Sequence, residues 1–248
     1  NIVNSKLNTK ENIESKLIIG CEGRESNLSK LADIKSNVKK YNQIAYTFLI
    51  ENKELNRATA YQFFSEKGIF AVMPYPDNAN DKYTIVWSIH ENKLKDDSKF
   101  FQNNFNFFEK KIGTELKIIS EVINFKLSSH HLENYFKDKI VLVGDSAHSI
   151  HPLAGQGINL GFSDANILCE EIKNAHNCKY PLSHYSILKS YEARRKSANK
   201  IMMSSIDGLN NIFETDNLYI RLLRNYGLNF VDKSHALKSF FMRQASGE

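Results

Sequence analysis

The stretch KIVLVGDSAHSIHPLAGQGINLGFSDANIL, from Lys139 to Leu168, constrains the fold more than any other part of the chain. Its four consecutive apolar residues, 140–143, are typical of a strand that is covered on both faces. Beyond Gly157, apolar or small residues recur at steps of three and four, which is the spacing of one helical face. They are Ile158, Gly161, Ala165, Leu168 and Ile172. A covered strand that leads through a turn into a helix indicates an α/β layer.

Polar groups stand on either side of this turn. Asp145 follows the strand, and an ionised carboxylate only accepts hydrogen bonds, which suits the hydroxyl groups of a sugar or sugar alcohol. The helix start Gly155-Gln156-Gly157 offers backbone N–H groups, the positive end of the helix dipole and close access for a ligand. Asn159 adds a donor and an acceptor. Because no phosphate-binding lysine follows the glycines, the set predicts a cofactor with a polyol chain and an electron-accepting ring rather than ATP.

The remaining segments supply further strands and helices. Residues 17–19 form a short apolar strand that ends in the turn GCEGRES. Residues 41–90 alternate as strands do, with a hairpin turn at residues 65–68. We also expect a helix over residues 100–112, a strand over 119–127, and helices over 181–203 and from 217 onwards.

The order of these elements predicts the fold class. A strand and turn, a β-rich insert, a covered strand with its helix, and C-terminal helices indicate a mixed α/β (α+β) fold with two domains in one chain. Residues 1–35 and 131–180 are predicted to form the first domain, and residues 36–130 the β-rich second domain. Residues 181–248 are predicted to form a C-terminal helical region. Five aromatic residues of the insert are expected in its sheet core rather than in a pocket wall: Tyr61, Phe63, Phe70, Trp87 and Phe125.

The residues from Gly144 to Leu168 resemble the second flavin motif of the class A flavoprotein aromatic hydroxylases, and within them the ubiquinone-biosynthesis (2-octaprenylphenol-type) hydroxylase family. The resemblance implies a partial FAD-binding Rossmann-like domain with an inserted β-sheet substrate domain and C-terminal helices. It also implies that Gly144 and Asp145 contact the ribityl chain and pyrophosphate of FAD. Along the isoalloxazine ring it places Pro152, Gly155, Gln156, Gly157 and Asn159.

A second motif agrees in order and spacing. The segment IIGCEGRES resembles the family's Asp-Gly motif, which serves both flavin and nicotinamide. Gly23, Arg24 and Ser26 match this motif, but Glu22 stands where the family has aspartate. Because glutamate is one methylene longer, we expect the hydrogen bonds of the turn in shifted geometry. Arg24 has the plain alternative of a solvated surface charge.

The resemblance implies an oxidoreductase, namely a flavoprotein monooxygenase that uses FAD and NAD(P)H to hydroxylate an aromatic ring, here of a polyprenylated phenol in ubiquinone biosynthesis. Spacing alone identifies no catalytic acid or base. Residues 1–16 supply no Gly-x-Gly-x-x-Gly turn, so the chain resembles the family without its N-terminal dinucleotide-binding part. Three interpretations follow. A companion chain carries that part, the sequence is a piece cut from a longer protein, or the gene is broken and the chain is a non-catalytic fragment that cannot bind FAD alone. The expected partner is such a companion chain or, in a homo-oligomer, a second copy of this chain.

Specific features disfavour other functions. The Gly-x-Ser-x-Gly pattern of a nucleophile elbow fails at His148. We expect His148 and His151 to pack the turn rather than to bind a metal with Asp145. The net charge of +5, from 33 basic and 28 acidic residues, comes without a nucleic-acid-binding motif, so no nucleic-acid partner is expected. Three cysteines without metal-like spacing favour a reducing cytoplasm.

The C-terminal segment, residues 218–243, places basic residues among Leu, Phe and Tyr. The charged residues are Arg221, Arg224, Lys233, Lys238 and Arg243, against the single acid Asp232. Such a surface suits peripheral contact with anionic lipid at the inner membrane face. It equally suits an ordinary helical exterior packed on the domain, and both interpretations stand.

Overall fold

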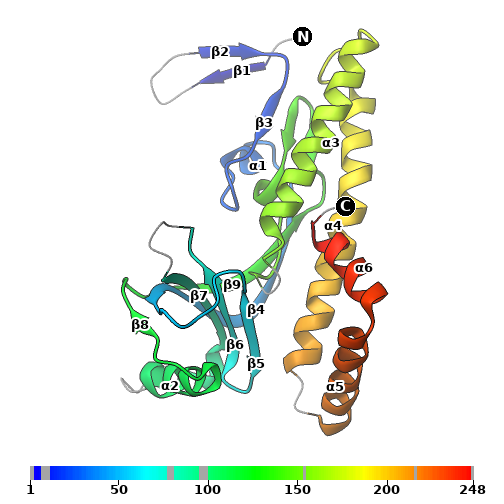
Figure 1. Ribbon diagram of the computed structural model, residues 1–248. Coiled ribbons are helices and arrows are strands. Elements are labelled where there is room, and N and C mark those ends of the chain that lie inside the picture. Colours follow the sequence, from blue (N-terminus) through cyan, green and yellow to red (C-terminus); the bar gives the residue numbers. More distant parts are fainter. Residues whose placement is uncertain are drawn as a thin grey trace. The chain divides into compact units, whose positions relative to one another are not determined.

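The computed structural model describes residues 3–6, 12–76, 81–94, 100–152, 155–214 and 217–246, and Figure 1 shows their ribbon. The chain divides into two compact units: unit 1 comprises residues 1–39 and 129–248, and unit 2 comprises residues 40–128. The two divisions fall inside strands β4 (Ser36–Glu51) and β9 (Ile123–Leu132). Unit 2 is therefore an insert into the chain of unit 1.

Unit 2 is built on an antiparallel sheet. The strands β5 (Tyr61–Ser65), β6 (Gly68–Pro74) and β7 (Lys82–His90) pair in chain order, and β7 also pairs with β4 along its whole length. The short strand β8 (Lys117–Ile118) pairs with the end of β4. Every second residue of β7 from Tyr83 to Trp87 is fully buried, as the two-residue period of a strand requires.

Helix α2 (Phe100–Ile112) packs on this sheet (Figure 1). The helix carries Phe105 and Phe108 into the core, where they meet Phe70 and Trp87 of the sheet. The ring centroids of Phe70 and Phe108 are 4.2 Å apart, with an angle of 11° between the ring planes. Burying one such side chain contributes about 1.5–3 kcal/mol to folding, so this aromatic cluster holds the insert together.

The prediction of five core aromatic residues is correct for two of them and wrong for one. Phe70 and Trp87 are fully buried, and Tyr61 and Phe63 are half-buried against the same core. Phe125, in contrast, is 48% exposed. The first four residues of β9 are all exposed, so the described part of the chain covers neither face of the strand there.

Unit 1 contains a small sheet of three strands. Strand β3 (Ile18–Gly20) pairs in parallel with β11 (Ile140–Leu142), and β10 (Phe136–Lys137) pairs antiparallel with β11. Val141 and Leu142 are fully buried, as the apolar run predicts. Because β3 and β11 are parallel, the turns that follow them lie at the same edge of the sheet.

Two short ladders complete the strands of unit 1. Strand β1 (Val3–Lys6) pairs with β2 (Asn12–Ser15), and β12 (His148–Ser149) pairs with the last part of β9. The described residues also include the 3₁₀ turns η1 (Glu91–Lys93) in unit 2 and η2 (Gly144–Ser146) in unit 1.

The helices of unit 1 are α1 (Asn27–Leu31), α3 (Gly157–Asn177), α4 (Tyr185–Glu214), α5 (Leu218–Lys233) and α6 (His235–Ser246). Helices α3 and α4 pack against each other, as Figure 1 shows. Helix α3 begins at Gly157, with Gln156 as its N-cap residue, so Gly155 precedes the helix instead of opening it. Among the described residues, no helix has the length and apolarity that crossing a membrane requires. The predicted mixed α/β fold class is confirmed.

The predicted hairpin turn at residues 65–68 joins β5 to β6. Gly68 has a φ of +102°, and a Cβ at this position would lie 2.2 Å from the carbonyl oxygen of Ser88. The indole N–H of Trp87 donates to the carbonyl of Lys67 at 2.8 Å. Both contacts bring the turn against β7, so only glycine fits here.

We expect Gly68→Ala to lower the free energy of unfolding, because alanine adds both backbone strain and a collision with Ser88. Gly113→Ala is the matched control, since Gly113 has a φ of +89° but no described atom within 4 Å of its Cβ position. The control should lose about 1–2 kcal/mol from strain alone. Urea denaturation of both variants makes the comparison. Equal losses would contradict the packing argument.

Candidate cofactor-binding site

The turn after β3 and the turn after β11 are joined by one buried hydroxyl group. The Ser146 Oγ accepts a hydrogen bond from the Gly23 N–H at 3.0 Å and donates to the Gly23 carbonyl at 3.2 Å. Ser146 is 1% exposed. The structure therefore brings the predicted residues Gly23 and Asp145 into adjacent turns, although more than a hundred residues separate them in the chain.

The turn at Gly144 is shaped for a close approach to α3. Gly144 has a φ of +60°, and a Cβ there would lie 3.4 Å from the Cα of Gly161. Glycine is the residue that adopts this backbone conformation without strain. The next residue, Asp145, is exposed. The Asp145 side chain is thus exposed between two buried residues, Gly144 and Ser146.

The start of α3 is open, as the sequence predicts. No described atom lies within 4 Å of a Cβ built at Gly155 or at Gly157, and within the described structure the Gln156 side chain makes no capping hydrogen bond. The Asn159 amide donates to the Gln156 Oε1 at 3.1 Å, and the exposed Pro152 accepts from the Gly155 N–H at 3.1 Å. These features suit a flat, electron-rich group against the backbone at the positive end of the helix.

Glu22 makes the local hydrogen bonds of its turn in spite of its extra methylene. Its carboxylate accepts from the Ser26 hydroxyl at 2.6 Å and from the Leu28 N–H at 3.0 Å. These bonds, the one from Ser26 foremost, lower the pKa of Glu22. The carboxylate is thereby tied to the first turn of α1, where negative charge is favoured.

Arg24 is exposed beside this turn, and its charge reaches the buried histidine His130. Burial lowers the pKa of His130 to about 4, and the positive charge of Arg24 adds to the effect. The pKa of His131 is also lowered to about 4, first by burial and then by His148. The His130 Nδ1 lies 2.8 Å from the Ser149 Oγ, and the His131 Nε2 lies 3.0 Å from the Tyr135 Oη. Both histidines are therefore neutral members of a packed polar core.

Sequence reasoning included Asp164 in the flavin pattern but missed its contacts, which organise this core. Its Oδ2 lies 2.9 Å from the Gly144 N–H donor and 2.6 Å from the His148 Nε2. Its Oδ1 accepts from the Arg195 Nε at 2.6 Å and from the Asn199 amide at 3.2 Å. Burial raises the pKa of Asp164, but these hydrogen bonds outweigh burial and leave the pKa below its ordinary value. Asp164 is thus an ionised carboxylate with several donors.

Helix α4 supplies the other residues that sequence reasoning missed. Tyr191 donates from its hydroxyl to the Leu142 carbonyl at 2.9 Å, and the Glu192 carboxylate accepts from the Tyr135 N–H at 2.9 Å. Tyr191, Arg195 and Asn199 are spaced by four residues and are all buried. A charged and an amide residue on the buried face of a helix indicate a buried polar partner, and this was the available signal.

The predicted packing role of His148 agrees with its contact to Asp164, since that bond fixes the ring in the core. His151 is also buried, at 1% exposure. Among the described residues, no group of three or more His, Cys, Asp or Glu side chains is arranged to hold a metal ion.

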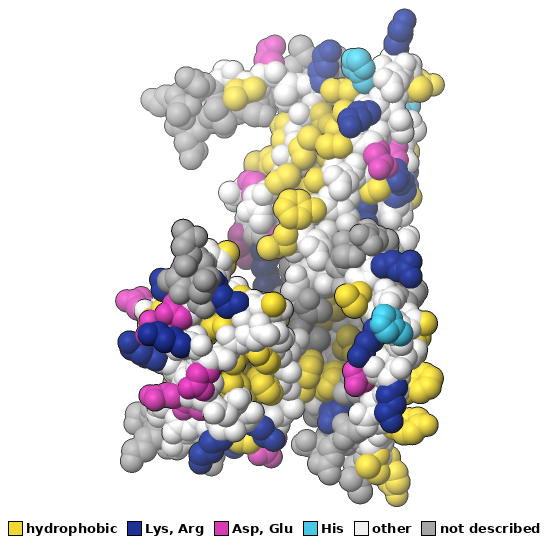
Figure 2. Space-filling model, in the orientation of Figure 1, with side chains coloured by type: hydrophobic (Ala, Val, Ile, Leu, Met, Phe, Trp, Pro, Cys, Tyr) yellow, Lys and Arg dark blue, Asp and Glu magenta, His cyan; other side chains and the backbone are white. Residues whose placement is uncertain are grey.

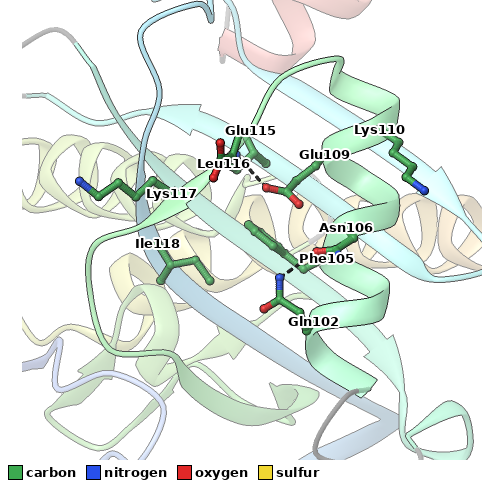
Figure 3. A pocket seen from close by; sticks show the side chains of 9 residues that line it. All are labelled: Gln102, Phe105, Asn106, Glu109, Lys110, Glu115, Leu116, Lys117 and Ile118. Carbon is green, nitrogen blue, oxygen red and sulfur yellow. Dashed lines mark hydrogen bonds between the residues drawn. The ribbon is translucent and has the colours of Figure 1, made fainter.

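A separate pocket of about 540 Å³ lies in unit 2, between α2 and the segment that leads into β8 (Figure 3). Glu109 accepts from the Leu116 N–H at 2.9 Å and so fastens that segment to the helix. The residues that line the pocket are Gln102, Phe105, Asn106, Glu109, Lys110, Glu115, Leu116, Lys117 and Ile118. None of the residues predicted for cofactor binding is among them.

Comparison with known proteins shows the family of the chain. The family model described as "FAD binding domain" matches residues 1–205. Ubiquinone hydroxylase UbiL of Rhodospirillum rubrum is 28% identical over 249 residues, which are 99% of this chain and 57% of that protein. The 3-demethoxyubiquinol 3-hydroxylase of Escherichia coli is 29% identical over 242 residues, 96% of this chain and 61% of that protein. The predicted resemblance to ubiquinone-biosynthesis hydroxylases is confirmed.

Solved structures support the fold. The Diels-Alderase PyrE3 has a TM-score of 0.73 at 20% identity over 99% of this chain and 53% of its own. PqsL, described as a probable FAD-dependent monooxygenase from Pseudomonas aeruginosa, has a TM-score of 0.71 at 20% identity, with 85% of this chain and 60% of its own covered. The chain spans a little over half the length of the curated relatives and of the two structures named here.

We expect the free energy of unfolding to fall as the pH decreases from about 6.5 to about 4. In that window the unfolded chain protonates His130 and His131, whereas the folded chain keeps both neutral. Each contributes a slope of up to about 1.4 kcal/mol per pH unit. His130→Asn and His131→Gln, which keep a nitrogen near the bonded position, should each remove about half of this slope in urea denaturation.

The matched control is His235→Asn, since His235 is exposed in α6. This variant should keep the slope of the parent chain. A slope that neither core variant changes would show that the two histidines are not held neutral by burial.

Proposed function

Because this chain belongs to the family of FAD-binding domains, we propose that it forms the substrate-domain and C-terminal part of a flavin-dependent hydroxylase acting on an aromatic ring. The observation that carries the proposal is that an exposed carboxylate, at Asp145 in η2, and an open helix start, at Gly157 of α3, belong to two elements that pack together. The names of the relatives point to ubiquinone biosynthesis as the setting.

The proposed contacts with FAD follow from the chemistry of these groups. Asp145 accepts hydrogen bonds from the ribityl hydroxyl groups, and Gly144 allows the chain to pass close to the backbone. The residues proposed along the isoalloxazine ring are Pro152, Gly155, Gln156, Gly157 and Asn159. Bound flavin supplies the electron transfer and the activation of dioxygen. The protein binds and orients the cofactor, and the backbone N–H groups at the start of α3 favour negative charge on the ring.

The turn Glu22-Gly23-Arg24 is proposed to border the same cofactor. Gly23 has a φ of +82° with no described atom within 4 Å of its Cβ position, which leaves room for a ligand at the backbone. Since Glu22 is engaged at the start of α1, its part is to hold the turn. Arg24 is the proposed contact for anionic groups of FAD or of NAD(P)H, the proposed reductant.

The proposed substrate is a phenol with a polyprenyl tail, because the named relatives act on ubiquinone precursors. The proposed partner is a polypeptide that carries a strand, a Gly-x-Gly-x-x-Gly turn and a helix, or a second copy of this chain. The alternative is that the chain is a non-catalytic fragment that does not retain FAD. Flavin content decides between these proposals.

The deciding experiment is to isolate the chain from its natural host and to record its absorbance from about 350 to about 500 nm, where oxidised flavin absorbs. A bound flavin, together with NAD(P)H oxidation stimulated by a prenylated phenol and one oxygen atom gained by the phenol, would support the proposal. A colourless protein that stays colourless with added FAD would support the fragment.

We expect Asp145→Ala to weaken FAD binding about tenfold or more, because hydrogen bonds to a charged group contribute about 1.5–3 kcal/mol. Glu133→Ala is the control, as Glu133 is an exposed carboxylate of unit 1 outside the proposed site. Quenching of flavin fluorescence gives both dissociation constants. Equal affinity in the two variants would refute the ribityl assignment.

Helix α5 carries an apolar surface that we propose contacts lipid. The side chains of this α5 surface recur at helical spacing and are at least 57% exposed: Tyr219, Leu222, Leu223, Tyr226 and Phe230. Four of them, with Asn229, line a hollow of about 610 Å³. Figure 2 shows hydrophobic side chains exposed over this helix. An apolar helix face beside basic residues is the arrangement that binds membrane surfaces.

Two basic residues near the α5 surface contact other side chains of the chain. The Arg224 guanidinium lies 5.0 Å from the centre of the Phe213 ring, and Lys238 pairs with Asp232 at 2.6 Å. Arg224 and Lys238 therefore make contacts within the chain. We propose that apolar insertion contributes most of the affinity and that the net positive charge of the segment adds attraction to anionic lipid.

We expect Leu223→Glu to abolish co-sedimentation of the chain with vesicles that contain anionic phospholipid, because the α5 surface then carries a charge. Leu31→Glu is the control, since Leu31 is 79% exposed on α1 and Leu223 is 71% exposed. The control should bind vesicles as the parent does. Failure of the parent chain to sediment with vesicles at low salt would refute the lipid proposal.

A further inference from the structure

We propose that Asp164 is a positioning residue, which fixes the Gly144–Asp145 turn to helix α4 and thereby holds the Asp145 carboxylate in its binding direction. The inference rests on the proposed function of Asp145 as a cofactor contact. It assigns a role to a residue that does not itself contact the cofactor. It also links the Gly144–Asp145 turn to helix α4, which lies further along the chain.

The two oxygens of Asp164 serve different elements. Oδ2 accepts from the Gly144 N–H at 2.9 Å, on the side of the turn. Oδ1 accepts from the Arg195 Nε at 2.6 Å, on the side of α4. Asp164 is fully buried, so water does not compete for either oxygen. One carboxylate on α3 therefore couples the position of the turn to the position of α4.

Arg195 is held in place from more than one side. Its Nη2 donates to the Asn199 Oδ1 at 2.8 Å and approaches the Leu160 carbonyl at 3.4 Å. Asn199 in turn donates to the Asp164 Oδ1 at 3.2 Å. The guanidinium cannot swing away without breaking several bonds, and this makes it a fixed support for the carboxylate.

Helix α4 also holds the strand just before the turn. The Tyr191 hydroxyl donates to the carbonyl of Leu142, the last residue of β11, at 2.9 Å. Burial raises the pKa of Tyr191, so the hydroxyl keeps its proton and stays a donor. The chain is thus fixed at Leu142 through Tyr191 and at Gly144 through Asp164. These anchors lie on either side of Val143, directly before Asp145.

A stabilising role alone does not explain a buried ion pair at this place. Replacing a buried charge pair by apolar side chains of similar size is often neutral or stabilising. Apolar side chains, however, offer no acceptor to the Gly144 N–H. Gly144 has a φ of +60°, and a Cβ built on it would lie 3.4 Å from the Gly161 Cα, so the direction of its N–H is set by this turn. The carboxylate therefore fits a role in which the geometry of the turn matters.

The test measures amide hydrogen exchange at Gly144 and FAD affinity in the full chain. We expect Asp164→Asn to accelerate exchange at Gly144 at least tenfold without flavin and to weaken FAD binding. Ile206→Ala is the structural control, because Ile206 is 2% exposed further along α4. It should destabilise the chain but leave amide exchange at Gly144 and the affinity for FAD unchanged. If Asp164→Asn does not fold, Arg195→Lys, which keeps the charge but loses the Nε donor, is tested in its place.

Asp145→Ala separates this inference from the proposed function. It should weaken FAD binding while exchange at Gly144 stays that of the parent, because the Asp145 side chain is exposed. Unchanged exchange at Gly144 in Asp164→Asn would overturn the positioning role. Faster exchange in Asp164→Asn together with parental FAD affinity would also overturn the positioning role, provided that Asp145→Ala binds FAD more weakly than the parent. Parental FAD affinity in Asp145→Ala would overturn the proposed site itself, and the inference with it.

Discussion

The parallel pairing of β3 with β11 is the constraint on which the candidate site depends. Parallel strands end at the same edge of a sheet, and ligands of α/β folds bind beyond that edge. The pairing sets Ile140 opposite Ile18 and Leu142 opposite Gly20. A single hydroxyl group, on Ser146, then locks the two following turns together through both backbone groups of Gly23. Two short motifs thus become one surface.

A buried polar core lies behind that surface, and burying polar and charged groups costs free energy unless each has a partner. Removing one partner from a buried charge pair costs about 3–5 kcal/mol. Asp164 has hydrogen-bond donors on the turn at Gly144, on β12 at His148 and on α4 at Arg195. An apolar core would fold as well but would leave the turn amide without a partner. The polar core is therefore best understood as the support of an exposed carboxylate, with stability supplied mainly by apolar packing around Leu168 and Leu188.

Local features of the site were predictable from the sequence, and non-local ones were not. The covered strand, the turn at Asp145 and the helix start near Gly157 depend on neighbouring residues and on glycine, so the pattern alone indicated their positions to within two residues. The contacts of Asp164 depend on Arg195, thirty-one residues further on, and no local pattern fixes such a partner. Phe125 was misplaced because alternation predicts a strand but does not show which part of that strand is covered.

The most direct test of the account is a titration of the ¹⁵N-labelled chain with FAD, followed through the chemical shifts of its backbone amides. The account predicts the largest changes at Gly144, Asp145, Gly155 and Gly157, because those backbone groups border the proposed cofactor. Saturable binding of FAD with these amides unmoved, and with changes gathered instead in the unit 2 pocket beside Glu109, would contradict it.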